Sequence, residues 1–219
     1  MREPTIAGII NNEEGRYEGD LGHYFRVLFT QARNLRHPYH NFRHSLHVMW
    51  LCYDAVIFYG GQVTKRDKRN LLIAAMFHDF DHSGQFGNDD LNIQRACRGL
   101  AKHIHPMDRD NREAIADLIK ASETPLAKER EATLTASQQI LRDADACQVL
   151  SVAWLQQVIF GLADEWGKPP LDVLRMQHKF LGNLRFLTGW ARHRFPRAVI
   201  EEKIQEADAL VAILEAPQL

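Results

Sequence analysis

The sequence predicts an all-α fold for this chain of 219 residues. Apolar residues recur at spacings of three and four along nearly all of it, which is the pattern of amphipathic helices. No alternating run rich in Val, Ile and Thr with hairpin turns appears, so strands are not expected. No linker or internal repeat divides the sequence. We therefore expect residues 1–219 to form a single compact multi-helix bundle of about eight to ten helices.

The expected elements follow one another with clear breaks. Residues 1–20 are polar and contain glycine, and we expect a loose N-terminal segment there. Pro38 and Pro106 interrupt the helical pattern, whereas Gly60 and Ser83 mark helix ends. The expected helices are 21–35, 40–60, 67–82, 92–104, 109–122, 129–151, 152–167, 171–193 and 196–214.

The composition argues against several classes of protein. The 27 Lys and Arg residues nearly balance the 28 Asp and Glu residues, so no global field favours long nucleic acid or an anionic membrane. Cys52, Cys97 and Cys147 lie far apart and are expected to be buried, reduced thiols. No apolar run reaches the roughly 18 residues of a transmembrane helix, and the acidic N-terminus does not resemble a signal peptide. A cytoplasmic protein is the expectation.

His78 and Asp79 follow a wholly apolar stretch, residues 71–77. A carboxylate at the end of a buried apolar helix costs several kcal/mol unless it is paired or bound to a metal. This cost is the physical argument for a cation beside Asp79. A solvated His and Asp at a helix end is the alternative interpretation of the dipeptide taken alone.

Further residues add ligands of the same kind. His40, His44 and His47 are spaced i, i+4, i+7, so they share one helix stripe. Asp145 lies in a helix with apolar neighbours, so a third helix can supply a carboxylate. Two histidines and two aspartates form a mixed set that suits zinc, iron or manganese, and a shared carboxylate suits a second, harder ion such as magnesium or manganese.

Two segments carry a resemblance to a known family. Residues 39–44 read Y-H-N-F-R-H and residues 78–84 read H-D-F-D-H-S-G. They resemble the Y-H-N-x-x-H and H-D-x-D-H-P-G motifs of the cyclic nucleotide phosphodiesterase catalytic domain, and residues 143–145 are similar to its late A-D segment. More broadly, the sequence resembles the HD-domain phosphohydrolase superfamily. The resemblance implies an HD-domain or phosphodiesterase-like helical bundle that cleaves a phosphoester of a nucleotide or cyclic nucleotide.

The resemblance also implies roles for individual residues. Asp79 would bridge to a second metal held otherwise by waters, and His82 would touch one of these waters or orient a ligand. His40 would be the general acid that protonates the leaving alkoxide after attack by a metal-activated hydroxide, with Asp79 and Asp145 also in catalytic positions. The residues that would bind the first metal are His44, His78, Asp79 and Asp145.

The sequence departs from the family near the second metal. His47 replaces the acid of the family's H-A-A-D, and we expect it to have a structural or ligand-supporting role. The family glutamate after the HD segment is replaced by Gln94 or is absent. Asp89, Asp90 and Glu123 are candidate replacements, and a solvated loop or helix end is the equal alternative for them.

Four residues are candidates for binding substrate. Gln177 and Phe180 have the Gln-x-x-Phe spacing of the family's purine clamp, although this spacing is common by chance and Phe180 can equally be a core residue. Asn41 is expected to hold the neighbourhood of His40 by hydrogen bonding. Arg43 lies beside the ligand stripe and is the best candidate for binding phosphate, with a plain surface arginine as the alternative.

Two other functions stay open. His47, His103 and His105 are surplus imidazoles of the kind that complete a di-iron site in some HD-domain oxygenases, although a solvated helix end is favoured for the last two. A non-catalytic nucleotide-binding module is the third reading. The expected partner is a small phosphoester, with no long nucleic acid and no membrane, and a homodimer is compatible with the sequence.

Overall fold

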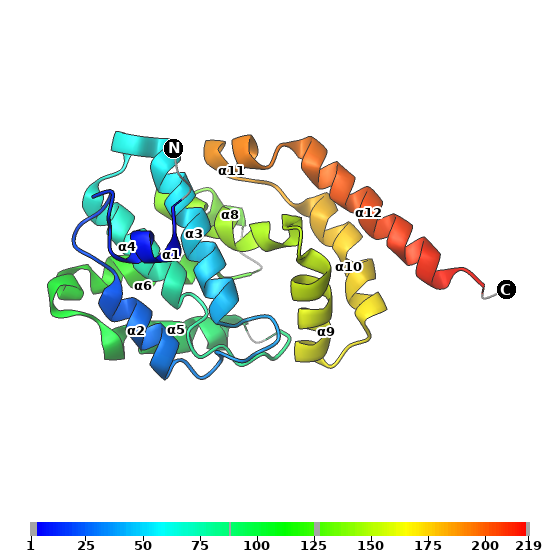
Figure 1. Ribbon diagram of the computed structural model, residues 1–219, viewed down its shortest axis with the longest axis horizontal. Helices are drawn as coiled ribbons and strands as arrows, with labels where there is room; N and C mark the ends of the chain where they lie inside the picture. Colours follow the sequence, from blue (N-terminus) through cyan, green and yellow to red (C-terminus); the bar gives the residue numbers. More distant parts are fainter. Residues whose placement is uncertain (1–3, 88, 125–127, 218–219) are drawn as a thin grey trace.

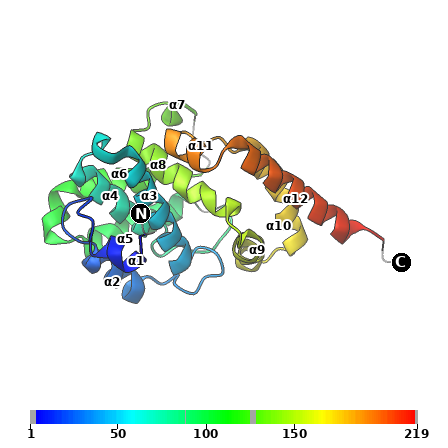
Figure 2. The same ribbon diagram turned by 45° about the horizontal axis from the view of Figure 1, so that its top comes forward.

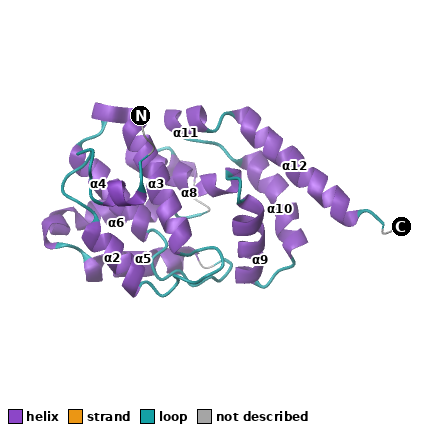
Figure 3. Ribbon diagram, in the orientation of Figure 1, coloured by secondary structure: helices purple, strands orange, loops and turns teal. Residues whose placement is uncertain are grey.

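Every regular element is helical in the computed structural model, which describes residues 4–87, 89–124 and 128–217 (Figures 1 and 3). The prediction of an all-α fold is confirmed. The described residues form twelve α-helices, more than the number expected, because two long expected helices are divided and one further short helix forms within residues 1–20. The α-helices are α1 (Ile6–Ile10), α2 (Gly22–Gln31), α3 (Phe42–Tyr59), α4 (Lys65–Phe77), α5 (Asp89–His103), α6 (Arg112–Ala121), α7 (Lys128–Glu131), α8 (Ala136–Ala146), α9 (Gly161–Trp166), α10 (Pro170–Asn183), α11 (Gly189–Arg194) and α12 (Arg197–Glu215).

The helix expected over residues 129–151 is divided because Thr135 begins a new helix. The N–H of Gln138 donates to Thr135 Oγ1 at 3.4 Å, and the N–H of Thr135 donates to Gln138 Oε1 at 2.9 Å. This reciprocal capping box satisfies two backbone donors at the start of α8. A short 3₁₀-helix, Cys147–Leu150, then follows α8.

The helix expected over residues 171–193 is divided because Asp143 holds the segment between α10 and α11. The Asp143 carboxylate accepts from the N–H groups of Leu187 and Thr188 at 2.8–3.1 Å and from the Thr188 hydroxyl at 2.7 Å. Thr188 in turn caps α11 with its side chain. These bonds tie the C-terminal helices to α8.

The N-terminal segment is packed and not loose over residues 4–20, which corrects the expectation for that part. Ile9 is fully buried and Tyr17 is nearly so, because both contribute to the apolar core. The Asn12 side chain closes the turn between them through hydrogen bonds with the backbone of Arg16, Tyr17 and Gly19. Residues 1–3 lie outside the described part of the chain.

α4 is the central helix of the main core. Its residues from Lys68 to Phe77 are all buried, and it packs against α3, α6 and α8. The apolar stretch before His78 therefore does lie in the interior. The carboxyl end of α4 meets the first turn of α3 and the last turn of α8, and this meeting point positions the site.

A second apolar cluster lies beside this core. It joins the π-helix Leu155–Phe160 to α9, α10 and α12 around the buried Trp154. In Figures 1 and 2 these helices lie to one side of the remaining helices, and the C-terminal end of α12 extends away from the rest of the molecule.

Within the described residues, no single helix combines the length and apolar composition that a membrane span needs. One pair of helices, residues 136–150 and 155–166, meets these limits only when taken together, and it bends by 102° at its break.

Candidate metal centre and active site

Four side chains from three helices converge where α4 ends. His44 lies in the first turn of α3, His78 and Asp79 directly follow α4, and Asp145 lies in the last turn of α8. His44 Nε2 lies 3.0 Å from Asp145 Oδ1, 3.2 Å from Asp79 Oδ2 and 3.2 Å from His78 Nε2. His78 Nε2 lies 3.3 Å from Asp79 Oδ2 and 3.5 Å from Asp145 Oδ1. We call these four residues the donor quartet.

Both imidazoles present the same nitrogen to the centre. His44 Nδ1 bonds to Gln148 Oε1, and His78 Nδ1 bonds to the Ala75 carbonyl at 2.8 Å. Since these acceptors can only take a proton, each ring carries its hydrogen on Nδ1 when neutral. Each Nε2 then directs a lone pair to the centre, which is the arrangement that metal-binding histidines adopt.

The donor quartet fits a divalent cation. An ion about 2.1 Å from each ligand atom separates neighbouring ligand atoms by roughly 3.0–3.4 Å, close to the distances found here. Asp79 Oδ2 is buried and has no hydrogen-bond partner among the described residues. A buried carboxylate oxygen without a partner is costly. A cation at the centre would remove this cost and separate the two facing imidazole nitrogens.

The pKa shifts within the quartet also indicate that positive charge at its centre is stabilised. Burial alone would lower the pKa of His44, but the close carboxylates of Asp145 and Asp79 raise it to about 9. Burial would likewise raise the pKa of Asp145, but the nearby His78 and His44 hold it well below its ordinary value. The two carboxylates therefore retain protons on the imidazoles, and a metal ion would replace these protons.

His40 lies beside the quartet and is held by Glu165 of α9. His40 Nδ1 contacts Glu165 Oε1 at 2.5 Å, and Glu165 Oε2 accepts from the N–H groups of Tyr39 and His40 at 2.9 and 3.0 Å. Burial would raise the pKa of Glu165, but these bonds outweigh it and lower the pKa to about 2. The His40 ring also stacks on the His82 ring, with centroids 3.6 Å apart.

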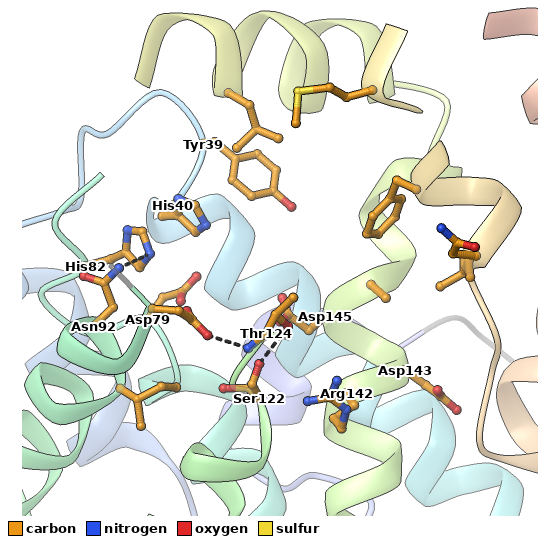
Figure 4. A pocket seen from close by; sticks show the side chains of 18 of the residues that line it. Tyr39, His40, Asp79, His82, Asn92, Ser122, Thr124, Arg142, Asp143 and Asp145 are labelled. Atoms are coloured by element: carbon orange, nitrogen blue, oxygen red, sulfur yellow. Dashed lines mark hydrogen bonds between the residues drawn. The ribbon is translucent and has the colours of Figure 1, made fainter. Parts of the chain in front are cut away.

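The donor quartet opens into a cavity of about 880 Å³. Figure 4 shows His40, Asp79 and Asp145 around this space, with Ser122, Thr124 and Arg142 on another side. Its walls from α9 and α10 include the apolar side chains Leu162, Trp166, Met176 and Phe180. A cavity of this size that combines apolar walls with a few convergent polar groups is typical of a small-molecule site.

A second group of close donors comprises His37, His82 and Glu165. Two of its members already have partners, because His82 Nδ1 accepts from the Gly84 N–H at 3.0 Å and Glu165 bonds to His40. A metal here would have to displace these buried bonds. The donor quartet, with its unpartnered carboxylate oxygen, is therefore the better cation site.

Comparisons with known proteins agree with this geometry. The sequence model of the 3′,5′-cyclic nucleotide phosphodiesterase family matches residues 39–142, a little under half of the chain. The match includes His40, His44, His78 and Asp79 and ends just before Asp145. No curated protein matches the chain.

Solved structures extend the likeness over most of the chain. The phosphodiesterase domain of Salpingoeca rosetta rhodopsin phosphodiesterase has a TM-score of 0.65 at 14% identity, covering 87% of this chain and 80% of that one. LmjPDEB1 in complex with IBMX has a TM-score of 0.59 at 15% identity, covering 95% of this chain and 84% of that one. The structural matches show the fold of phosphodiesterase catalytic domains, and together with the partial family match they support a cyclic nucleotide phosphodiesterase-like domain. The matched family and fold support a hydrolase that acts on phosphoric ester bonds.

Two predicted substrate residues of the phosphodiesterase-like domain have other surroundings. Asn41 caps α3, because its Oδ1 accepts from the N–H groups of Arg43 and His44 while its Nδ2 donates to the carbonyls of His37 and Pro38. Its hydrogen-bonding capacity is used in the backbone. Arg43 is exposed and is not among the described residues that line the cavity. The structure thus brings neither residue to the cavity.

The predicted base-binding pair is separated by the turn of α10. Phe180 lines the cavity, whereas Gln177 is buried and its Nε2 donates to the Val173 carbonyl at 3.4 Å. Gln177 is not among the described lining residues, because it belongs to the buried side of α10 together with Val173, Leu174 and Leu181. Asn183, one turn after Phe180, does line the cavity.

The residues expected near the second metal differ in placement. His82 lines the cavity, but its Nδ1 accepts from the Gly84 N–H and its Nε2 contacts Asn92 at 2.8 Å, so both ring nitrogens already have partners within the protein. Glu123 pairs instead with Arg130 at 2.7 Å. Burial lowers the pKa of His47 to about 4, and His47 lies outside the cavity lining of the described residues.

Of the three candidate replacements for the family glutamate, Asp89 is the one that lines the cavity among the described residues. It accepts from the Thr124 N–H. Burial raises the pKa of Asp89, the Thr124 N–H lowers it, and the charges of Asp79 and Asp145 raise it further. Gln94 is exposed and donates to Asp90 at 2.8 Å, so it takes no part in the cavity.

His103 and His105, which suggested a di-iron site, lie outside the cavity lining of the described residues. His105 caps a 3₁₀-helix by accepting from the Met107 N–H, and the His103 ring packs against Phe80. His23 Nε2 also bonds to the His103 carbonyl at 2.7 Å. Neither predicted imidazole lies among the described cavity residues, so a di-iron site loses the extra ligands on which it rested.

Three functional residues were missed from the sequence. Glu165 orients His40, Gln148 orients His44, and the buried Asn34 donates to the backbone carbonyls of His40 and Asp79 at 2.7 and 2.9 Å. Glu165 and Gln148 lie over a hundred positions from the histidines they hold. No local sequence pattern identifies these residues. The sequence offers only one signal, which is a polar side chain within a largely apolar helical segment.

Proposed function

We propose that the protein is a metal-dependent phosphodiesterase that hydrolyses a phosphoester bond of a nucleotide or cyclic nucleotide. The single observation that carries the proposal is the convergence of the donor quartet at a cavity wall beside the His40–Glu165 pair. The phosphodiesterase-like sequence match and fold support the same reaction. The placement of the chain in the wider HD-domain superfamily rests on the order of the quartet in the sequence.

The residues fit a first divalent ion held by the donor quartet, for which we propose zinc, iron or manganese. Asp79 would also reach a second ion, magnesium or manganese, and Asp89 would orient the water around it. Divalent ions here would supply Lewis-acid activation of water and would neutralise charge on the phosphate oxygens. Asp79 and Asp145 would act as ligands, and Gln148 would fix the ring of His44.

His40 is the proposed proton donor to the leaving oxygen. Its Nδ1 is committed to Glu165, so Nε2 is the atom that would deliver the proton. The buried Glu165 carboxylate contacts the ring through Nδ1 and so holds it in one orientation, which a general acid requires. Stacking on His82 holds the ring plane, while Phe180 offers an apolar surface for a nucleobase.

We also propose a small phosphoester as the partner and the cytoplasm as the location. Cys52, Cys97 and Cys147 are free thiols, as a reducing compartment favours.

The experiment compares two leaving groups. Purified protein loaded with manganese should hydrolyse both bis(p-nitrophenyl) phosphate and a cyclic nucleotide from a panel. H40Q should lower kcat for the nucleotide about 10²- to 10⁴-fold but have much less effect with bis(p-nitrophenyl) phosphate, because p-nitrophenolate leaves without a proton. D145N should abolish both activities by removing a ligand.

H178Q is the matched control, since His178 forms an exposed pair with Asp208 at 2.8 Å outside the cavity. It should leave both rates unchanged. The proposal is wrong if metal-loaded wild-type protein turns over neither the chromogenic diester nor cyclic, mono- or triphosphate nucleotides. Equal losses with both substrates in H40Q would remove the acid role alone.

A further inference from the structure

Three cationic side chains that do not belong to the donor quartet line the cavity: Arg142, Lys179 and Arg185. Among the described residues, none of them forms an ion pair with a carboxylate. Nearby cations outside the cavity do form such pairs. Arg175 of α10 contacts Glu215 at 2.6 Å, and Arg130 contacts Glu123 at 2.7 Å. Acidic side chains, including Glu131 and Asp143, also line the cavity, but none of them lies within ion-pair distance of these three cations among the described residues.

The two arginines are oriented by the backbone. Arg142 Nη1 donates to the carbonyls of Ala121 and Glu123 at 2.6 and 2.8 Å. Arg185 Nη1 donates to the carbonyls of Gly182 and Leu184, both at 2.8 Å. These neutral acceptors fix each guanidinium without cancelling its charge, and they leave Nε and Nη2 for an anion. A fixed guanidinium with remaining donors is well suited to bind phosphate.

Lys179 and Phe180 are adjacent on α10, and Asn183 follows one turn later. A nucleobase against Phe180 would thus have a cation and a carboxamide beside it. The cavity volume of about 880 Å³ lies near the upper end of the range for small-molecule sites. The cavity has room for a ligand that reaches from the donor quartet to these cations.

We propose that Lys179 and Arg185, supported by Arg142, form a second anion subsite that binds a further phosphate group of the substrate. The substrate class is then a phosphodiester with at least one additional phosphate, such as a 5′-phosphorylated dinucleotide. This inference rests on the proposed function. It goes beyond the proposed function by naming a narrower substrate class, because a cyclic mononucleotide has a single phosphate and would leave the subsite empty.

The test compares the dinucleotides pApA and ApA, which share one phosphodiester bond and differ by a terminal 5′-phosphate. Wild-type enzyme should show a kcat/KM about tenfold or more higher for pApA, since a charge-assisted hydrogen bond has an effect of this size. The double variant K179Q/R185Q should lose that preference, so that its kcat/KM for pApA falls to about its own value for ApA. Added salt should weaken the preference, because both side chains are exposed.

R175Q is the matched control, because it removes one charge from the same helix outside the cavity. It should keep the preference. Equal kcat/KM values for pApA and ApA in wild type, or an unchanged preference in the double variant, would overturn the inference.

Failure of the proposed function gives a different result, namely no hydrolysis of either dinucleotide. In that case calorimetric titration of wild-type protein with the two uncleaved dinucleotides decides the inference. A Kd about tenfold lower for pApA, lost in K179Q/R185Q, supports the subsite. Equal Kd values reject it.

Discussion

At the scale of single residues, Glu165 sets how His40 can act. Its carboxylate has a side-chain exposure of only 3% and bonds to the His40 ring and to two backbone N–H groups. It therefore orients the ring, fixes the segment before α3 and places a negative charge beside the imidazole. Removing the charge while keeping the shape separates these contributions.

E165Q should lower kcat by about tenfold, because a charge-assisted hydrogen bond to the proton donor is weakened. The loss should be smaller with bis(p-nitrophenyl) phosphate, because p-nitrophenolate leaves without a proton. Steady-state kinetics with both substrates measures the two losses. An equal loss with both substrates would mean that Glu165 is only structural.

Glu165 should also contribute to stability in a defined pH window. Its folded-state pKa, about 2, lies below the ordinary value of 4.5. A depressed pKa stabilises the folded state above pH 4.5, and this contribution is lost as the pH falls from 4.5 towards 2. The difference in free energy of unfolding between wild type and E165Q, from urea titrations, should shrink over that interval. A difference that stays constant would contradict the lowered pKa.

Gln148 should control metal affinity without being a ligand. Its Oε1 accepts from His44 Nδ1, and its Nε2 donates to Gln157 Oε1 at 2.7 Å. Q148A should weaken metal binding by about 10- to 100-fold, because the ring of His44 loses its orienting acceptor. Competition with a chromogenic chelator measures the change. Q157A, which leaves the bond to His44 intact, should have a smaller effect.

At the scale of elements, the approach of α5 to the loop after α4 depends on Gly99. A Cβ at Gly99 would lie 2.3 Å from Cδ1 of Phe80, whose ring packs between the two segments. G99A should destabilise the fold by about 1–3 kcal/mol through overpacking and should lower metal affinity, because Phe80 directly follows Asp79. Thermal unfolding tests this, with G182A as the control, since a Cβ at Gly182 meets nothing within 4 Å.

Helix periodicity predicted the elements better than their ends. The apolar stretch of α4 is buried, as its sequence predicted. α3 begins at Phe42, close to the start predicted at residue 40. The breaks before α8 and α11 were missed because Thr135 and Thr188 cap helices inside segments whose apolar spacing continues across them. Capping depends on hydrogen bonds that the apolar pattern does not contain.

At the scale of the whole molecule, the site joins segments that are far apart in the sequence. The motif residues His44, His78 and Asp145 could be predicted because their chemistry is recognisable locally, and the structure brings their ligand atoms together. Glu165 and the cavity cations could not be predicted, because their positions depend on how α9 and α10 pack against the main core. Gln177 is buried and is not among the described residues that line the cavity, which the sequence likewise could not predict because it depends on how α10 packs.

The most direct test of the central claim is the hydrolysis rate measured as metal is added back to metal-free protein. If the donor quartet holds the ion on which phosphodiester hydrolysis depends, the rate should rise in proportion to bound metal, determined by elemental analysis, until the site is filled. D145N should then show neither tight binding nor turnover. Metal-free wild-type protein that hydrolyses the substrate as fast as the loaded protein would contradict the account.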